Sequence, residues 1–175
     1  MFKPTSLLLS CVLVLTASMA QAEASNSDSK LETILTDVLR YDAIKAERVG
    51  NSGKAIQAYM RAGIVNKKPN IRVDYTDYYL VKKPISFMGH ELFMIEEEYM
   101  SKYIGCCVSE GAGITVRLNG DDNALKHFAK NNACSVESKV DMPAQLKYLG
   151  LKAKVPMGDY VTLSCRDRDV VLKSE

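Results

Sequence analysis

The chain has 175 residues, nearly half of them hydrophobic, with 23 lysines and arginines against 21 aspartates and glutamates. This length is close to that of one typical domain and allows a hydrophobic core. A net charge of +2 gives no support to nucleic-acid binding or to attraction by an anionic membrane, because both favour a concentrated basic surface. We therefore expect no nucleic-acid partner.

Residues 1–22 have the three parts of a secretory signal peptide in the expected order. Lys3 is the charged part, residues 7–15 are the apolar part, and Ala20-Gln21-Ala22 is the small-x-small cleavage site. The apolar run is shorter than the roughly 20 apolar residues that a helix needs to cross a bilayer. No later apolar run in the sequence is nearer to that length. We expect no transmembrane anchor, and a short leader of this kind indicates the periplasm or the outside of a bacterial cell.

A lipoprotein is the alternative interpretation, with residues 8–11 as the lipidation motif and Cys11 as the modified residue. The apolar run continues through residues 12–15, where a lipoprotein turns polar, so we favour cleavage after Ala22. Residues 23–30 are small and polar and predict a flexible leader. Residues 31–175 are then expected to form a single globular domain.

Two helices are expected in the first part of this domain. Apolar residues recur with helical spacing over residues 31–39, and Ser29 with Glu32 resembles a capping box. A shorter run over residues 55–60 has the same spacing, and Gly63 follows it as a plausible stop.

The middle of the chain predicts strands. Alternation over residues 71–81 indicates one long strand that ends before Pro84, residues 87–90 indicate a turn, and residues 92–95 a return strand. Residues 103–108 and 114–118 have strand composition and flank a glycine-rich connection at 109–113, which is compatible with a hairpin.

The last third predicts two short helices and a strand. Asp121 or Asp122 can cap a helix that buries Leu125, Phe128 and Ala129. A second helix is framed by Asp141, Pro143 and Gly150, and residues 161–166 alternate as a final strand.

These elements predict an α+β fold, in which N-terminal helices pack on a mainly antiparallel sheet of about five strands. A helix between the fourth and the final strand is also the order of an OB-like, partly open barrel, which we keep as a sub-class. No sequence motif assigns the chain to a family.

Four of the five cysteines lie beyond the leader, at Cys106, Cys107, Cys134 and Cys165. In an oxidising compartment an even number predicts two disulfides that brace the domain. Neighbours on a strand point to opposite faces, so we expect Cys106 and Cys107 to pair separately with Cys134 and Cys165. A vicinal Cys106–Cys107 bond is the alternative.

Candidate chemistry is sparse. His90 and the acidic run Glu96-Glu97-Glu98 have no recognised metal-ligand spacing, and a solvated acidic face explains the run better. Cys106 or Cys107 could form a nucleophilic pair with His90 or His127. An oxidising compartment disfavours such a pair, because the thiol would be oxidised to a disulfide. Redox CxxC, GxSxG, HExxH and phosphate-loop motifs are missing from the sequence. We predict no catalytic residue, no metal and no cofactor.

A recognition surface is the remaining candidate. Tyrosines concentrate on neighbouring predicted strands, where they offer contact area and a hydroxyl, although strand propensity also explains them. Asp77 interrupts the apolar face between Tyr75 and Tyr79. Its carboxylate either faces a ligand or is held for a partner, or a local bulge or a strand end places it in water. The predicted binding residues are Tyr75, Asp77, Tyr79, Glu96, Glu97, Glu98 and Tyr99.

Three hypotheses of function follow. The first is a non-catalytic binding or inhibitory module that recognises another envelope or secreted protein. The second is an OB-like binder of a small polar ligand or glycan. The third is a small hydrolase or thiol enzyme. The partner's identity and the oligomeric state are not encoded in any motif.

Overall fold

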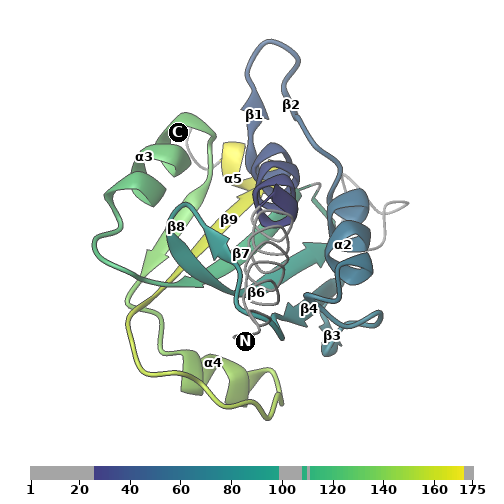
Figure 1. The fold of residues 1–175 in the computed structure, drawn as a ribbon. Coiled ribbons are helices and arrows are strands. Elements are labelled where there is room, and N and C mark those ends of the chain that lie inside the picture. Colours follow the sequence, from purple (N-terminus) through teal and green to yellow (C-terminus); the bar gives the residue numbers. More distant parts are fainter. Residues whose placement is uncertain (1–25, 99–107, 110, 172–175) are drawn as a thin grey trace, which may run out of the picture.

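The computed structural model describes residues 26–98, 108–109 and 111–171 (Figure 1). Residues 26–39 are helical. The labelled elements that follow are β1 Tyr41–Asp42, β2 Glu47–Arg48, α2 Ser52–Arg61, β3 Ile71–Val73, β4 Thr76–Leu80, β5 Ser86–Phe87, β6 His90–Glu98, β7 Gly111–Arg117, α3 Asn123–Asn131, β8 Ser135–Ser138, α4 Met142–Tyr148, β9 Tyr160–Arg166 and α5 Asp167–Val171.

A seven-stranded antiparallel sheet forms the body of the molecule. Its strand order is β3-β4-β6-β7-β9-β8, and the short β5 pairs with β6 off this path. Together with the helices this confirms the predicted α+β class. The OB-like sub-class is wrong: the sheet is not closed into a barrel, since β8 adds to the outer side of β9 and β3 forms the other edge.

The two faces of the sheet are covered differently. The main core packs the helix at residues 26–39, α2 and α3 against one face, with Leu35, Tyr59 and Leu125 among its buried side chains. On the other face, α4 places Met142 and Leu146 against Met94 and Tyr160 in a smaller apolar cluster. In Figure 1, α4 lies apart from the other helices at the lower end of the molecule.

The predicted helices are present, with one difference at the first. Residues 26–30, expected to belong to a flexible leader, are helical, so Ser29 lies inside the helix and the predicted capping box is wrong. Glu32 instead accepts a hydrogen bond from the backbone N–H of Met88 at 2.6 Å. The helix predicted at 55–60 is α2, and Asn51 caps it by accepting from the backbone N–H of Lys54 at 2.9 Å.

The long strand predicted over residues 71–81 is a β-hairpin. Asp74 and Tyr75 both have positive φ, 48° and 65°, and form the two-residue turn between β3 and β4. Two such residues match the right-handed twist of paired strands, which is why the chain reverses there. The alternation of apolar and polar residues that is typical of strands continues across this turn. The sequence pattern alone therefore does not reveal where the chain reverses.

The predicted glycine-rich connection is also wrong in part, because Gly111 and Gly113 lie inside β7. This strand pairs with β6 on one side and with β9 on the other. Residues 103–107 of the predicted hairpin lie outside the described residues.

The two helices and the final strand predicted for the last third are present, and β8 was not predicted. Helix α3 buries Leu125 and Ala129, whereas Phe128 is only partly buried. Asp122 occupies its N-cap position without a side-chain capping hydrogen bond, and Asp121 accepts from the backbone N–H of Asn123 at 2.9 Å. Asp141 caps α4 by accepting from the backbone N–H of Ala144 at 3.0 Å. The final predicted strand is β9.

The disulfide that the structure describes joins Cys134 to Cys165. In the β8–β9 ladder Ser135 pairs with Ser164, which puts the next residues, Cys134 and Cys165, opposite each other with a Cα–Cα distance of 4.3 Å. The predicted pairing of these two cysteines with Cys106 and Cys107 is therefore wrong. Cys106 and Cys107 lie outside the described residues.

Among the described residues we find no helix with the length and apolar character needed to span a membrane.

Candidate functional site

The short β1–β2 hairpin projects from the body of the molecule (Figure 1). Tyr41 pairs with Arg48 and Asp42 with Glu47, and the turn between them spans residues 43–46. One carboxylate oxygen of Asp42 accepts from the backbone N–H groups of Ile44 at 2.9 Å and of Lys45 at 3.2 Å. The side chain thereby fixes the turn, as aspartate commonly does at the start of a loop.

The apex of this hairpin exposes one large apolar side chain beside Lys45. The side chain of Ile44 is 97% exposed, and residues 43–47 are all exposed. A single exposed isoleucine is common on protein surfaces. Its significance here depends on how firmly the base of the hairpin is held.

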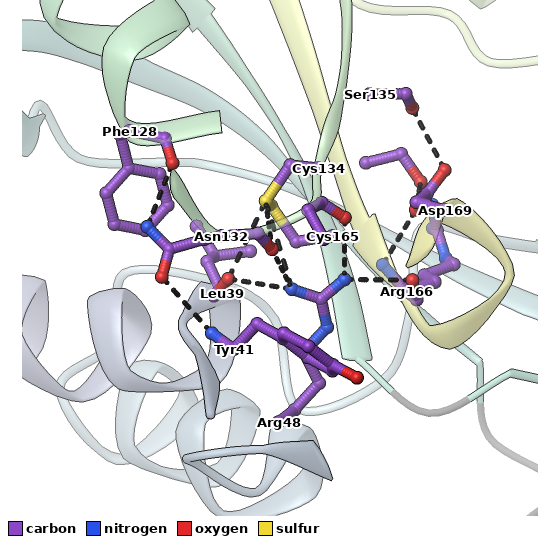
Figure 2. Close-up of a disulfide and its surroundings, with 12 residues drawn as sticks. Leu39, Tyr41, Arg48, Phe128, Asn132, Cys134, Ser135, Cys165, Arg166 and Asp169 are labelled. Atoms are coloured by element: carbon purple, nitrogen blue, oxygen red, sulfur yellow. Dashed lines mark hydrogen bonds between the residues drawn. A yellow bond between two sulfur atoms is a disulfide. The ribbon is translucent and has the colours of Figure 1, made fainter. Parts of the chain in front are cut away.

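Arg48 holds that base, as Figure 2 shows. Its side chain is inserted into the body, and the residue is only 7% exposed. Nη1 donates to the backbone carbonyl oxygens of Leu39 at 3.1 Å and Asn132 at 2.6 Å. Nη2 donates to the carbonyl oxygens of Ala133 at 3.1 Å and Arg166 at 2.9 Å.

These four carbonyls belong to three separate parts of the fold: the end of the first helix, the connection between α3 and β8, and the end of β9. The Tyr41 ring centroid lies 5.3 Å from the Arg48 guanidinium carbon, a favourable cation–π distance. Burial lowers the pKa of Arg48, and the negative charges of Asp167 and Asp169 oppose that shift. An arginine stays charged in such a site, so each hydrogen bond is charge-assisted.

The Cys134–Cys165 disulfide lies directly beside this anchor (Figure 2). Nη1 of Arg48 is 4.0 Å from the Cys134 sulfur. Asn132, two residues before Cys134, accepts from the backbone N–H of Tyr41 at 3.2 Å and donates to the carbonyl of Phe128 at 2.9 Å. The hairpin base is thus fastened to the segment that the disulfide ties to β9.

The predicted binding residues are divided between the two faces of the sheet. Asp77 and Tyr79 lie on the main core face, where Arg72 forms a two-point ion pair with Asp77 at 2.5 and 2.7 Å. The hydroxyl of Tyr79 donates to Asp77 at 3.3 Å. Burial, followed by the charge of Asp77, raises the pKa of Tyr79. Glu97 pairs with Asp77 across the ladder, and burial is the main cause that raises the pKa of Glu97.

Glu96 and Glu98 lie on the opposite face and are buried, so the expected solvated acidic face is wrong for them. The buried guanidinium of Arg166 reaches across β7 to both carboxylates, with N···O distances of 2.9 and 3.0 Å. Gly113 makes this possible, because a Cβ there would lie 3.0 Å from both Arg166 and Glu96. The ion pairs join β6 to β9 across the intervening strand.

Tyr75 lies in the β3–β4 turn and is exposed, whereas Tyr99 lies outside the described residues. The structure therefore does not place the seven predicted residues on one surface. The β1–β2 hairpin was missed by the sequence interpretation. A signal for it exists in Asp42 followed by an isolated Ile44 within a polar stretch between two helices.

The two histidines differ in burial and in their hydrogen-bond partners. His90 is buried at the start of β6, and its Nδ1 accepts from the backbone N–H of Asn119 at 3.1 Å. His127 is exposed on α3 beside Asn131. Within the described part of the chain, His, Cys, Asp and Glu side chains form no group of three that could hold a metal ion.

His90 also lines an open pocket of about 470 Å³. Its polar lining includes Ser86, Asn119 and the Glu91–Arg117 ion pair, and Pro84, Ile85 and Leu118 supply apolar area. Because Nδ1 accepts a hydrogen bond, Nε2 carries the proton when His90 is neutral and is a donor.

Comparison of the chain with protein-family models, with curated proteins and with solved structures gave no match.

Proposed function

We propose that this chain is an exported, non-catalytic binding or inhibitory module that recognises a protein partner through the tip of its β1–β2 hairpin. The observation that carries the proposal is a fully exposed Ile44 on a projecting hairpin whose base is fixed by the buried Arg48. Its partner offers an apolar pocket that accepts one branched side chain.

Rigidity is the physical reason for choosing this surface. Ordering a free loop at an interface costs about 1–2 kcal/mol for each residue whose backbone becomes fixed. In this hairpin the Asp42 carboxylate, the Arg48 hydrogen bonds and the Asn132 contact order the turn before binding. A preorganised apolar anchor therefore retains more of its contact energy as affinity.

Export agrees with two further features. Residues 1–22 have the pattern of a secretory signal peptide. Cys134 and Cys165 form a disulfide, which is typical of oxidising compartments such as the periplasm. We propose the periplasm or the cell exterior as the place where the module works.

Affinity capture from an envelope extract tests the proposal, with the mature chain as bait. Ile44→Asp should abolish capture of the partner, because an anchor at an interface centre contributes about 2 kcal/mol or more. Gln57→Asp is the matched control, since it introduces the same charge at an exposed residue of α2, away from the hairpin tip. Equal retention by both variants would exclude the hairpin as the recognition element.

A small polar ligand or glycan is the second candidate function, and the pocket beside His90 favours it. The pocket combines donors from Arg117 and His90 with acceptors from Glu91 and Asn119, as hydroxyl-rich ligands require. A titration with mono- and disaccharides tests this candidate, with the NMR signals of the His90 ring protons as the readout. Unchanged signals at millimolar sugar would remove this candidate.

A further inference from the structure

A second pocket is lined by residues of α4 and of the connection that follows it. Helix α4 lies at the end of the molecule opposite the β1–β2 hairpin (Figure 1). The volume of the pocket is about 490 Å³. The apolar part of its lining comes from Pro143, Leu146, Leu151 and Val155, and two lysines, Lys147 and Lys152, lie at the same pocket. Of the described residues that line this pocket, the two lysines are the only charged ones. A mainly apolar pocket with positive charge beside it is suited to an acyl chain with an anionic headgroup.

The local charge agrees with this chemistry. Between Asp141 and Asp159 the sequence has three lysines, the third being Lys154, and no acidic residue. All three lysines are exposed. The whole chain is close to neutral, so its net charge alone does not reveal this cationic end.

The same segment exposes large apolar side chains. Tyr148, the last residue of α4, is 87% exposed, and Met157, in the connection to β9, is 94% exposed. Tyrosine and lysine are the side chains that favour the interface between lipid headgroups and acyl chains, because each joins an apolar stem to a polar end.

We propose that α4 and residues 149–158 bind the surface of a membrane that contains anionic phospholipid, with an acyl chain in the α4 pocket and the lysines against phosphate groups. Polybasic segments bind anionic bilayers through such contacts. An acidic peptide would pair with the lysines but would leave the apolar lining of the pocket without a partner. This inference does not depend on the function of the hairpin, which lies at the other end of the molecule.

Vesicle flotation of the mature chain tests the proposal. Vesicles of phosphatidylcholine with phosphatidylglycerol should carry the protein to the top of the gradient, and vesicles of phosphatidylcholine alone should not. Binding should fall as salt is raised, because the lysine contribution is screened.

The variant Lys147→Glu/Lys152→Glu/Lys154→Glu should bind the anionic vesicles at least about tenfold more weakly, since each lysine near such a surface contributes several-fold to affinity. The control Lys67→Glu/Lys68→Glu/Lys82→Glu makes the same change in net charge at exposed residues elsewhere and should bind normally. Tyr148→Ser/Met157→Ser should weaken binding without changing charge. Thermal melts of all variants check that they fold.

Three outcomes would overturn the proposal. The first is equal binding to both kinds of vesicle, and the second is an equal loss in the control variant, which would indicate a general charge effect. The third is binding of free fatty acid in the α4 pocket without any vesicle binding, which would make it a small-molecule site.

Discussion

Arg48 shows how much one side chain can hold together. A planar guanidinium has five N–H donors in a fixed arrangement, and Arg48 directs its two terminal nitrogens to four backbone carbonyls. Lysine has three donors on a single nitrogen and cannot reach all four oxygens. The anchor of the hairpin therefore requires arginine specifically.

We predict that Arg48→Lys lowers the free energy of unfolding by about 3 kcal/mol, because buried carbonyls left without a donor cost about 1–3 kcal/mol each. Urea denaturation followed by circular dichroism measures the change. Arg61→Lys, at an exposed position in the last turn of α2, is the control and should change stability by less than about 0.5 kcal/mol. Equal stability of the two variants would contradict the anchoring role.

Glu97 gives a prediction with a pH dependence. Its raised pKa means that folding favours the protonated carboxyl. The contribution of Glu97 to stability is therefore full below the ordinary glutamate pKa of 4.5 and is lost as pH rises through the pKa of the folded state. We predict that Glu97→Gln raises the melting temperature at neutral pH and leaves it unchanged near pH 4. Gln keeps an acceptor for Ser52, which hydrogen-bonds Glu97. A melting temperature that falls at neutral pH would mean that the charge is favourable.

At the scale of the element, the helices and the final strand could be predicted because their signals are local. Leu31, Leu35 and Leu39 lie on one face within a few turns, and Asp141 caps a helix that begins beside it. Burial of Glu96 and Glu98 could not be predicted, since their partner Arg166 is 70 residues from Glu96 in the sequence. The β3–β4 turn was missed because two non-glycine residues adopt positive φ there.

Gly113 in β7 makes this buried ion pair testable. We predict that Gly113→Ala lowers the free energy of unfolding by about 1–3 kcal/mol, because the new methyl group must displace Arg166 or Glu96. Gly53→Ala is the matched control: it meets only ordinary contacts in α2 and should stabilise the protein by about 0.5–1 kcal/mol. If both substitutions raise the free energy of unfolding, a methyl group at position 113 fits beside Arg166 and Glu96 without displacing them.

The cysteines give a prediction at the junction of β8 and β9. Non-reducing peptide mapping of the exported chain should recover Cys134 linked to Cys165, with neither linked to Cys106 or Cys107. Replacing both Cys134 and Cys165 by serine should lower the free energy of unfolding by about 3 kcal/mol, as expected when a disulfide closes a loop of this size. A peptide that joins Cys106 to either residue would contradict the register of the β8–β9 ladder.

At the scale of the whole molecule, the sheet separates two ends of different character. The β1–β2 hairpin with Ile44 projects at one end, and α4 with its lysines lies at the other (Figure 1). The two proposals together assign a protein partner to one end and a lipid surface to the other. Neither end was evident from composition, because the basic and acidic residues nearly balance over the chain.

The most direct test of hairpin recognition is site-specific photo-crosslinking in cells, with a photoreactive phenylalanine analogue in place of the exposed Lys45, next to Ile44. Recognition through the hairpin tip predicts a light-dependent adduct with one envelope protein. This adduct should be lost when Ile44→Asp is added and absent when the analogue replaces the exposed Gln57 on α2. An adduct that survives Ile44→Asp, or the same adduct from position 57, would contradict recognition through the hairpin tip.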